Sequence, residues 1–168
     1  MLNAIGKIIL RSKIHHENLK RQKKFLPWDQ VGKIALIIDK DDSLNKSIID
    51  RFIDETKKYI EVYYIETGSK QRSYNDWQCF SKKDKSLLNL PNKNVERELK
   101  NKKFDVVINT CSENNLFALS VCSSLSALLN CSENNRFNLA DLIIKKTGAT
   151  NLVNYLNETV RYLKMIRG

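Results

Sequence analysis

The feature that most constrains the fold is a short, β-branched apolar run at residues 103–111, Lys-Phe-Asp-Val-Val-Ile-Asn-Thr-Cys. Charged residues precede this run and the polar residues 112–115 follow it. A second run, at residues 33–39, has the same character, and a helical pattern follows each of them. Such runs are typical of strands that are buried on both faces of a parallel sheet.

Strand-like and helix-like segments alternate along the rest of the chain. This alternation predicts an α/β fold, a three-layer Rossmann-like sandwich with a mostly parallel sheet of five or six strands, preceded by a basic N-terminal helix. We expect residues 1–30 to form that helix and a linker, and residues 31–168 to form a single domain. The expected strands are residues 33–39, 60–65, 77–81 (near an edge), 103–111, 127–131 and 139–145, and the expected helices are residues 2–23, 43–58, 92–102, 114–126 and 151–167. The central strand should lie beside the first, at the switch point of the sheet, where ligands of such folds bind.

Positive charge is concentrated at the N-terminus of a chain whose formal net charge is +10. Up to Trp28, seven basic residues stand against Glu17 alone, which gives a local net charge of +6. Such an excess favours an anionic partner, although lysine-rich proteins can also be basic without a functional reason. The residues expected to contact that partner are Lys7, Arg11, Lys13, Lys20, Arg21, Lys23 and Lys24.

Several partners fit this basic segment. We favour RNA or a ribonucleoprotein, such as a ribosome-associated assembly, and six or seven phosphate contacts would give a log–log salt slope of roughly −4 to −6. An anionic membrane surface is an alternative, with Leu2, Ile5, Ile8, Ile9 and Leu10 at the lipid interface. The same apolar residues would also suit packing on the domain, a protein partner or a homodimer.

Two further features bear on the cellular compartment. No apolar segment approaches the ~20 residues that span a bilayer, and Lys7 interrupts the only N-terminal apolar run. The four cysteines show neither a C-x-x-C spacing nor a nearby histidine. We therefore expect a cytoplasmic protein with reduced thiols and no metal site, with a zinc site or a disulfide as the less favoured alternative.

Polar residues at the ends of predicted strands form a possible ligand crevice. The first predicted strand ends in an acidic turn, residues 39–43, of the kind that binds magnesium in response-regulator receiver domains and haloacid-dehalogenase-type phosphatases. The sequence Cys-Ser-Glu-Asn-Asn occurs at residues 111–115 and again at residues 131–135. Helix capping and turn formation explain both features more simply. The crevice residues would be Asp39, Asp41, Ser112, Asn114, Ser132 and Asn134.

Catalytic and cofactor motifs are lacking in the sequence. Neither G-x-G-x-x-G nor G-x-x-x-x-G-K occurs, so we expect no nucleotide cofactor of the usual kinds. The two histidines, His15 and His16, both lie in the basic segment, which leaves no base for a nucleophile in the domain. The sequence therefore favours a binding module over an enzyme, with a degenerate nucleotide-binding or nucleotide-sugar-binding domain as a further alternative.

Six segments of the sequence carry a further resemblance: Ile8-Ile-Leu-Arg11, Lys20-Arg21, Lys33–Asp39, Phe104–Asn109, Ala140-Asp-Leu-Ile-Ile144 and Tyr162-Leu-Lys-Met-Ile166. In these motifs the sequence resembles a family of uncharacterised small α/β proteins from Bacteroidetes-type bacteria. The likeness covers nearly the whole chain, rests on structural motifs and implies no particular activity. More remotely, Phe104–Asn109 and its following helix look like part of one half of heptosyltransferase-type glycosyltransferases, which hold a sugar nucleotide between two such halves.

Overall fold

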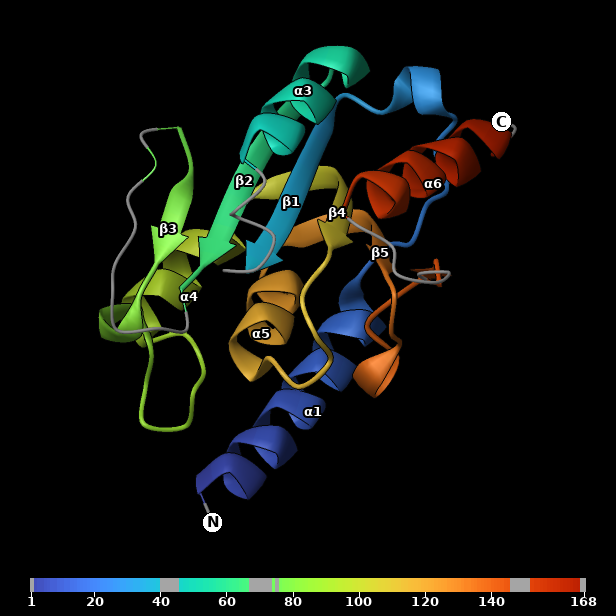
Figure 1. Ribbon diagram of the computed structural model, residues 1–168. Coiled ribbons are helices and arrows are strands. Elements are labelled where there is room, and N and C mark those ends of the chain that lie inside the picture. Colours follow the sequence, from blue (N-terminus) through green and yellow to red (C-terminus); the bar gives the residue numbers. More distant parts are fainter. Residues whose placement is uncertain (1, 40–45, 67–73, 75, 146–151, 167–168) are drawn as a thin grey trace.

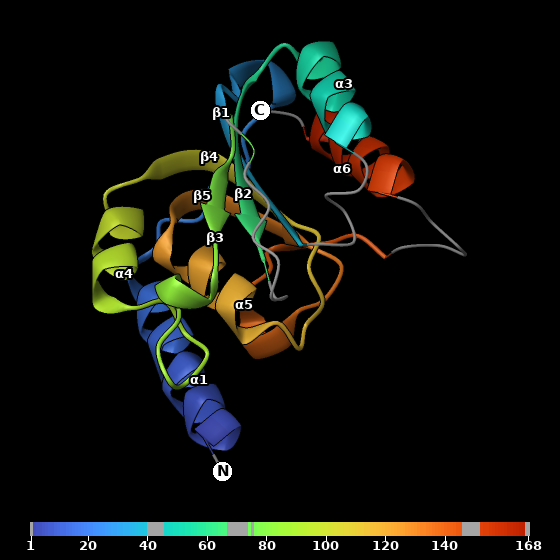
Figure 2. The same cartoon turned by 60° about the vertical axis from the view of Figure 1, so that its left-hand side comes forward.

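The protein forms a six-stranded, all-parallel sheet with helices on both faces (Figures 1 and 2). The computed structural model describes residues 2–39, 46–66, 74, 76–145 and 152–166. The strands are β1 (Lys33–Asp39), β2 (Tyr59–Ile65), β3 (Gln78–Phe80), β4 (Lys103–Asn109), β5 (Ser126–Ser132) and β6 (Leu142–Ile143). They run in the spatial order β3-β2-β1-β4-β5-β6, which confirms the Rossmann-like α/β fold that the sequence predicts.

The two most apolar strands lie side by side at the centre of the sheet. β1 pairs with β2 on one side and with β4 on the other, and Ala35 lies opposite Val107. The chain order reverses at this point, so the gap between the carboxyl ends of β1 and β4 is the switch point of the sheet. β3 and β6 are the edge strands.

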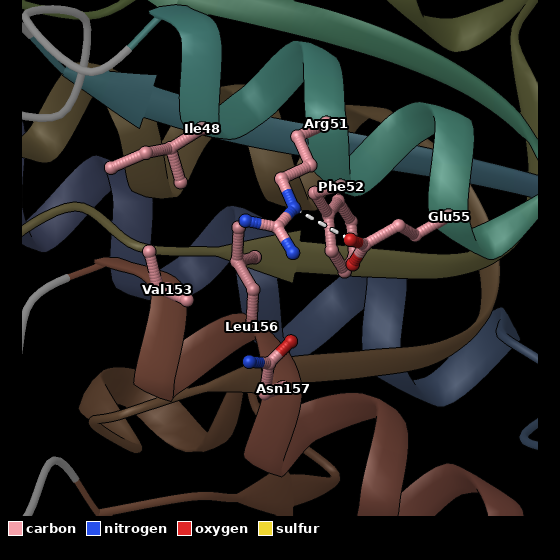
Figure 3. Close-up of a pocket in the computed structure, with 7 residues that line it drawn as sticks. All are labelled: Ile48, Arg51, Phe52, Glu55, Val153, Leu156 and Asn157. Carbon is pink, nitrogen blue, oxygen red and sulfur yellow. Dashed lines mark hydrogen bonds and ion pairs between the residues drawn. The ribbon is translucent and has the colours of Figure 1, made fainter.

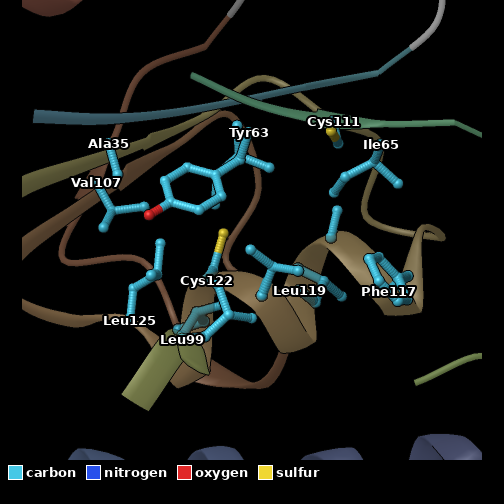
Figure 4. Close-up of a cluster of buried hydrophobic side chains, with 14 of the residues drawn as sticks. Ala35, Tyr63, Ile65, Leu99, Val107, Cys111, Phe117, Leu119, Cys122 and Leu125 are labelled. Carbon is cyan, nitrogen blue, oxygen red and sulfur yellow. The ribbon is translucent and has the colours of Figure 1, made fainter. Parts of the chain in front are cut away.

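The alternation of side chains along β1 feeds two separate cores. Ile34, Leu36 and Ile38 face α3 (Lys46–Thr56) and α6 (Leu152–Met165). Ala35 and Ile37 point to the opposite core, under α4 (Lys93–Lys100) and α5 (Leu116–Ser124). Figure 4 shows part of this second core, in which Tyr63 of β2 meets Leu119 and Cys122 of α5. Burial on both faces is what the uninterrupted apolar run of β1 predicts.

The N-terminal helix α1 (Leu2–Lys20) contributes to this second core. Leu10 and Ile14 are fully buried in it. α1 packs on α5, which explains why every residue of α5 is buried. Beyond α1, the backbone N–H of Lys24 donates to the carbonyl of Leu128 in β5. In the sequence pattern no strand precedes this helix, and packing on the domain was one of several alternatives for its apolar residues.

The last strand is shorter than the sequence predicts. The sequence predicts a strand over residues 139–145, whereas β6 has only two residues. Residues 139–141 instead close a loop on β5: the N–H of Asp141 donates to the carbonyl of Asn130, and its carboxylate accepts from the Asn130 N–H. In the described part of the chain, no helix is both long enough and apolar enough to cross a membrane.

Candidate anion-binding site

The seven basic residues of the N-terminal segment fall into two groups. Three of them form ion pairs with the domain: Lys13 with Glu96 of α4 at 3.0 Å, Arg21 with Asp141 at 2.6 Å and Lys23 with Asp141 at 2.9 Å. Lys13 also donates to the Ser124 hydroxyl at 2.8 Å. These three cations hold the N-terminal segment on the domain, with Arg21 and Lys23 sharing the single carboxylate of Asp141.

The other four, Lys7, Arg11, Lys20 and Lys24, are exposed. Within the described ranges, no carboxylate lies at ion-pairing distance from any of them. The segment from residue 82 to residue 103, which includes α4, adds eight basic residues against three acidic ones. Because Lys13 ties α1 to α4, both surpluses lie on the same helical layer. We call this surface the α1–α4 face.

The opposite helical layer is close to neutral. Residues 46–58 and 152–166, which include α3 and α6, carry six basic and four acidic residues. A cavity of about 140 Å³ lies between these helices, with Phe52 and Leu156 in its wall and the exposed Arg51–Glu55 ion pair at its rim (Figure 3). It gathers no surplus of one charge, so it is a poor candidate for an anion site.

Apolar side chains are also exposed on α1. Ile8 is 69% exposed and Leu19 is 73% exposed, and Ile5 and Ile9 are exposed as well. Leu10, one of the residues expected at a lipid interface, is in the core instead. The described part of α1 therefore presents one apolar stripe to the domain and a second, thinner one to solvent.

A polar cleft of about 530 Å³ opens where α1 meets the loop before α4 and the loop between β4 and α5. We call it the α1–α5 cleft. Two lysines and several side-chain amides line it, and none of its lining residues is acidic. It unites Lys7 from the predicted basic set with Ser112 and Asn114 from the predicted crevice set. The full lining is Asn3, Lys7, Lys85, Asn89, Ser112, Asn114, Asn115, Leu116 and Phe117.

The walls of this cleft are fixed by contacts between distant segments. Gly6 of α1 lies against the loop before α4 so closely that a Cβ there would be 2.6 Å from the Leu88 carbonyl oxygen. The Asn89 amide donates to Asn3 Oδ1 at 2.8 Å. Arg136 donates to the Glu113 carbonyl and to Asn114 Oδ1, both at 2.8 Å.

Lys85 lies in this cleft in a partly desolvated setting. Its ammonium group is 5.3 Å from the centre of the Phe117 ring and 3.4 Å from the carbonyl oxygen of Glu66. Burial lowers the pKa of Lys85 below its ordinary value, with the negative charge of Glu66 opposing this and the positive charge of Lys82 adding to it. A cation placed in this way gains from any anion that enters.

The remaining crevice residues do not join the α1–α5 cleft. Asp39 ends β1, and Asp41 lies outside the described residues. Ser132 and Asn134 line a separate space of about 10 Å³, which is too small for more than a water molecule. Between β1 and β4, Thr110 donates to the carbonyl of Ile37 through both its N–H and its hydroxyl.

The two copies of the Cys-Ser-Glu-Asn-Asn sequence share two kinds of local hydrogen bond, although the first forms a turn before α5 and the second begins at the end of β5. In each copy the serine hydroxyl accepts from the asparagine N–H two residues later, Asn114 to Ser112 and Asn134 to Ser132. The last asparagine of each copy then accepts from a backbone N–H farther along, that of Ala118 for Asn115 and that of Ala140 for Asn135. Turn formation and capping account for the repeat.

Sequence reasoning missed Lys85, Asn3, Asn89 and Asn115 as site residues. Lys85 stands among other lysines in a polar loop, and nothing in the local pattern sets it apart. Asn115 carries a readable signal, since it precedes an apolar helical run as an N-cap does. Its place in the cleft depends on how α1 docks, which the sequence does not encode locally.

Comparison with known proteins gives a family but no activity. No curated protein sequence matches this chain. Residues 3–166 match a family described as "Family of unknown function (DUF6913)". Since the match extends from α1 to α6, the docked helix and the sheet belong to one family unit. The chain is therefore a member of the DUF6913 family, whose function is unknown.

Proposed function

We propose that this chain is a non-catalytic cytoplasmic module that binds RNA through its α1–α4 face, within a ribonucleoprotein such as a ribosome-associated assembly. The observation that carries the proposal is the set of four exposed cations on and just after α1, without ion-pair partners in the described chain, beside the basic segment of α4. Phosphate contacts by such cations are largely independent of base sequence.

The breadth of the charged surface favours RNA as the anionic partner. The cations extend from α1 onto α4, as suits a polymer with a phosphate at every step. The amides of the neighbouring cleft add hydrogen-bonding groups that suit bases, sugars and phosphates. We further propose a bacterial, Bacteroidetes-type source and a likeness of this fold to one half of heptosyltransferase-type glycosyltransferases.

Fluorescence anisotropy with a labelled single-stranded oligoribonucleotide tests the proposal. Four phosphate contacts predict that the logarithm of the binding constant falls with the logarithm of the salt concentration with a slope of roughly −3. This slope is shallower than six or seven contacts would give, because three of the seven cations form ion pairs within the protein. The double substitution Arg11→Gln, Lys20→Gln should weaken binding and flatten the slope by about 1.4.

The matched control removes two cations from the opposite layer, Arg51→Gln with Lys164→Gln, and should leave both quantities unchanged. Affinity that is independent of salt, or an equal loss in the control, would refute RNA binding by the α1–α4 face.

A second candidate function rests on the exposed apolar stripe of α1. This stripe, formed by Ile5, Ile8 and Leu19, would suit an anionic lipid surface. The apolar side chains would lie among the acyl chains, and Arg11 and Lys20 beside them would contact the headgroups. Co-sedimentation with phosphatidylserine-containing vesicles tests this. Ile8→Ser with Leu19→Ser should abolish lipid binding while leaving RNA binding intact, and retention of lipid binding by this variant would reject the membrane function.

A further inference from the structure

We infer that the α1–α5 cleft is a binding site for a phosphomonoester, held by the ammonium groups of Lys7 and Lys85 and by side-chain amide donors. This goes beyond RNA binding through the α1–α4 face and does not depend on it. A small phosphorylated molecule could occupy the cleft in a protein that binds no RNA at all.

The hydrogen-bonding roles in the cleft are the main argument. Three lining asparagines already use their oxygens as acceptors: Asn3 accepts from Asn89, Asn114 from Arg136 and Asn115 from the Ala118 N–H. In the described structure, the NH₂ groups of these three side chains donate to no protein atom. Each therefore keeps two N–H donors for a ligand.

The orientation of two of these amides is fixed by chemistry. A guanidinium and a backbone N–H can only donate, so the atoms of Asn114 and Asn115 that meet them must be oxygens. The lining of the cleft thus contributes three NH₂ groups without a protein acceptor among the described residues, whereas each of the three amide oxygens already accepts one hydrogen bond.

The charges in the cleft agree with this pattern. Its lining includes two lysines and no carboxylate. Lys85 is partly buried and, within the described ranges, has no carboxylate at ion-pairing distance. Two ammonium groups match the double charge of a phosphomonoester better than the single charge of a carboxylate or a phosphodiester. A metal cation is disfavoured for the same reasons.

The start of α5 adds to the positive potential. Leu116 and Phe117 are the first two residues of α5 and line the cleft. Asn115 caps the third backbone N–H of the helix, that of Ala118. The helix dipole places positive charge at this end, where anions bind.

The size of the cleft indicates more than a bare phosphate ion. About 530 Å³ lies within the range of ordinary small-molecule sites. The phosphate oxygens would meet the lysines and amides, and the group that carries the phosphate would fill the rest. That group could be a small metabolite or the 5′ end of an RNA strand, and both sources present the same phosphomonoester.

Isothermal titration calorimetry of the full chain with inorganic phosphate and with adenosine 5′-monophosphate tests the site. We expect both to bind at low salt, and Lys85→Gln to weaken each by about tenfold, the effect of losing one charge-assisted hydrogen bond. Lys83→Gln is the control, since it removes an exposed lysine just two residues away that does not line the cleft.

Asn3→Asp provides a second variant that should fold without difficulty. It keeps an oxygen as the acceptor for Asn89 but places a negative charge in the cleft, at an exposed position near the start of α1. We expect it to weaken phosphate binding at least as much as Lys85→Gln. Absence of binding to wild-type protein, or equal affinities for wild-type protein and Asn3→Asp, would overturn the inference.

Two oligoribonucleotides of one sequence, with a 5′-phosphate or a 5′-hydroxyl, distinguish the sources. Tighter binding of the phosphorylated strand, lost in Asn3→Asp, would assign the cleft to RNA ends. Equal binding of the two strands, with adenosine 5′-monophosphate still bound, would assign it to a small molecule. Failure of both strands to bind would reject the RNA proposal. It would not affect the phosphomonoester inference, which the titrations with inorganic phosphate and adenosine 5′-monophosphate decide.

Discussion

Arg21 and Asp141, which are 120 residues apart in sequence, form an ion pair of 2.6 Å that fastens the end of α1 to the β5–β6 side of the sheet. The Asp141 side chain is only 2% exposed, and it also accepts from Lys23 and from the Asn130 N–H. One carboxylate thus joins the N-terminal segment, β5 and the start of β6. This relationship makes α1 part of the folded domain.

Removing the Asp141 carboxylate should therefore destabilise the protein strongly. Asp141→Ala leaves the largely buried Arg21 guanidinium without its carboxylate, and we expect the free energy of unfolding to fall by about 3–5 kcal/mol. Urea denaturation measures this. Glu55→Ala, which breaks an exposed pair with Arg51, should cost less than about 1 kcal/mol. Equal losses in the two variants would show that Asp141 is not the anchor of α1.

Gly6→Ala should destabilise the protein although alanine is the better helix former. The new Cβ would lie 2.6 Å from the Leu88 carbonyl oxygen, and that contact is with backbone, so α1 or the loop must move. We expect a net loss of about 1–3 kcal/mol, as for overpacking elsewhere. Ser12→Ala, at an exposed position of the same helix, should be neutral or stabilising. A stabilised Gly6→Ala protein would mean that α1 does not pack against this loop.

The sequence predicted the sheet well because its signals are local. β1 and β4 are continuous apolar runs, and such runs identify buried parallel strands without knowledge of their neighbours. The alternation of strands and helices predicted a parallel sheet, and the expectation that β4 lies beside β1 is confirmed by their pairing. The prediction was wrong at β6. Residues 139–141 have the pattern of a strand, but in the structure they form a loop that is hydrogen-bonded to β5 through Asp141.

The candidate site was harder to predict because long-range docking creates it. Lys7 and Ser112 were each singled out, yet for different reasons and for different sites, and only the packing of α1 brings them into one cleft. The same packing divides the basic residues into internal ion pairs and exposed cations. Neither spacing nor composition distinguishes Lys13 from Lys7, since the difference lies in Glu96, 83 positions from Lys13.

The four cysteines should differ sharply in reactivity toward thiol reagents. All four are free thiols; Cys111, Cys122 and Cys131 are buried, and Cys79 is half-buried. Burial raises the pKa of the Cys122 and Cys131 thiols far above the ordinary value, which suppresses the reactive thiolate. Alkylation with iodoacetamide, followed by mass spectrometry, should modify Cys79 first and the others only on unfolding. Early modification of Cys122 in native protein would contradict the burial of α5 beneath α1.

The tie between α1 and α4 should weaken in acid. Burial tends to raise the pKa of Glu96, but hydrogen bonds and charges from Lys13 and Lys100 outweigh it, so the pKa lies below the ordinary 4.5. A carboxylate with a lowered pKa in the folded state stabilises the protein above pH 4.5, and this contribution is lost as the pH falls through the folded-state pKa. The stability difference between wild type and Glu96→Gln should therefore be largest near neutral pH and shrink below pH 4.5.

Urea denaturation between pH 7 and pH 3 measures this difference in the free energy of unfolding. Glu98→Gln on the same helix is the control, because Glu98 accepts a hydrogen bond from Gln78 rather than from α1. A Glu96→Gln difference that stays constant from pH 7 to pH 3 would mean that the Glu96 carboxylate does not hold α1 in place.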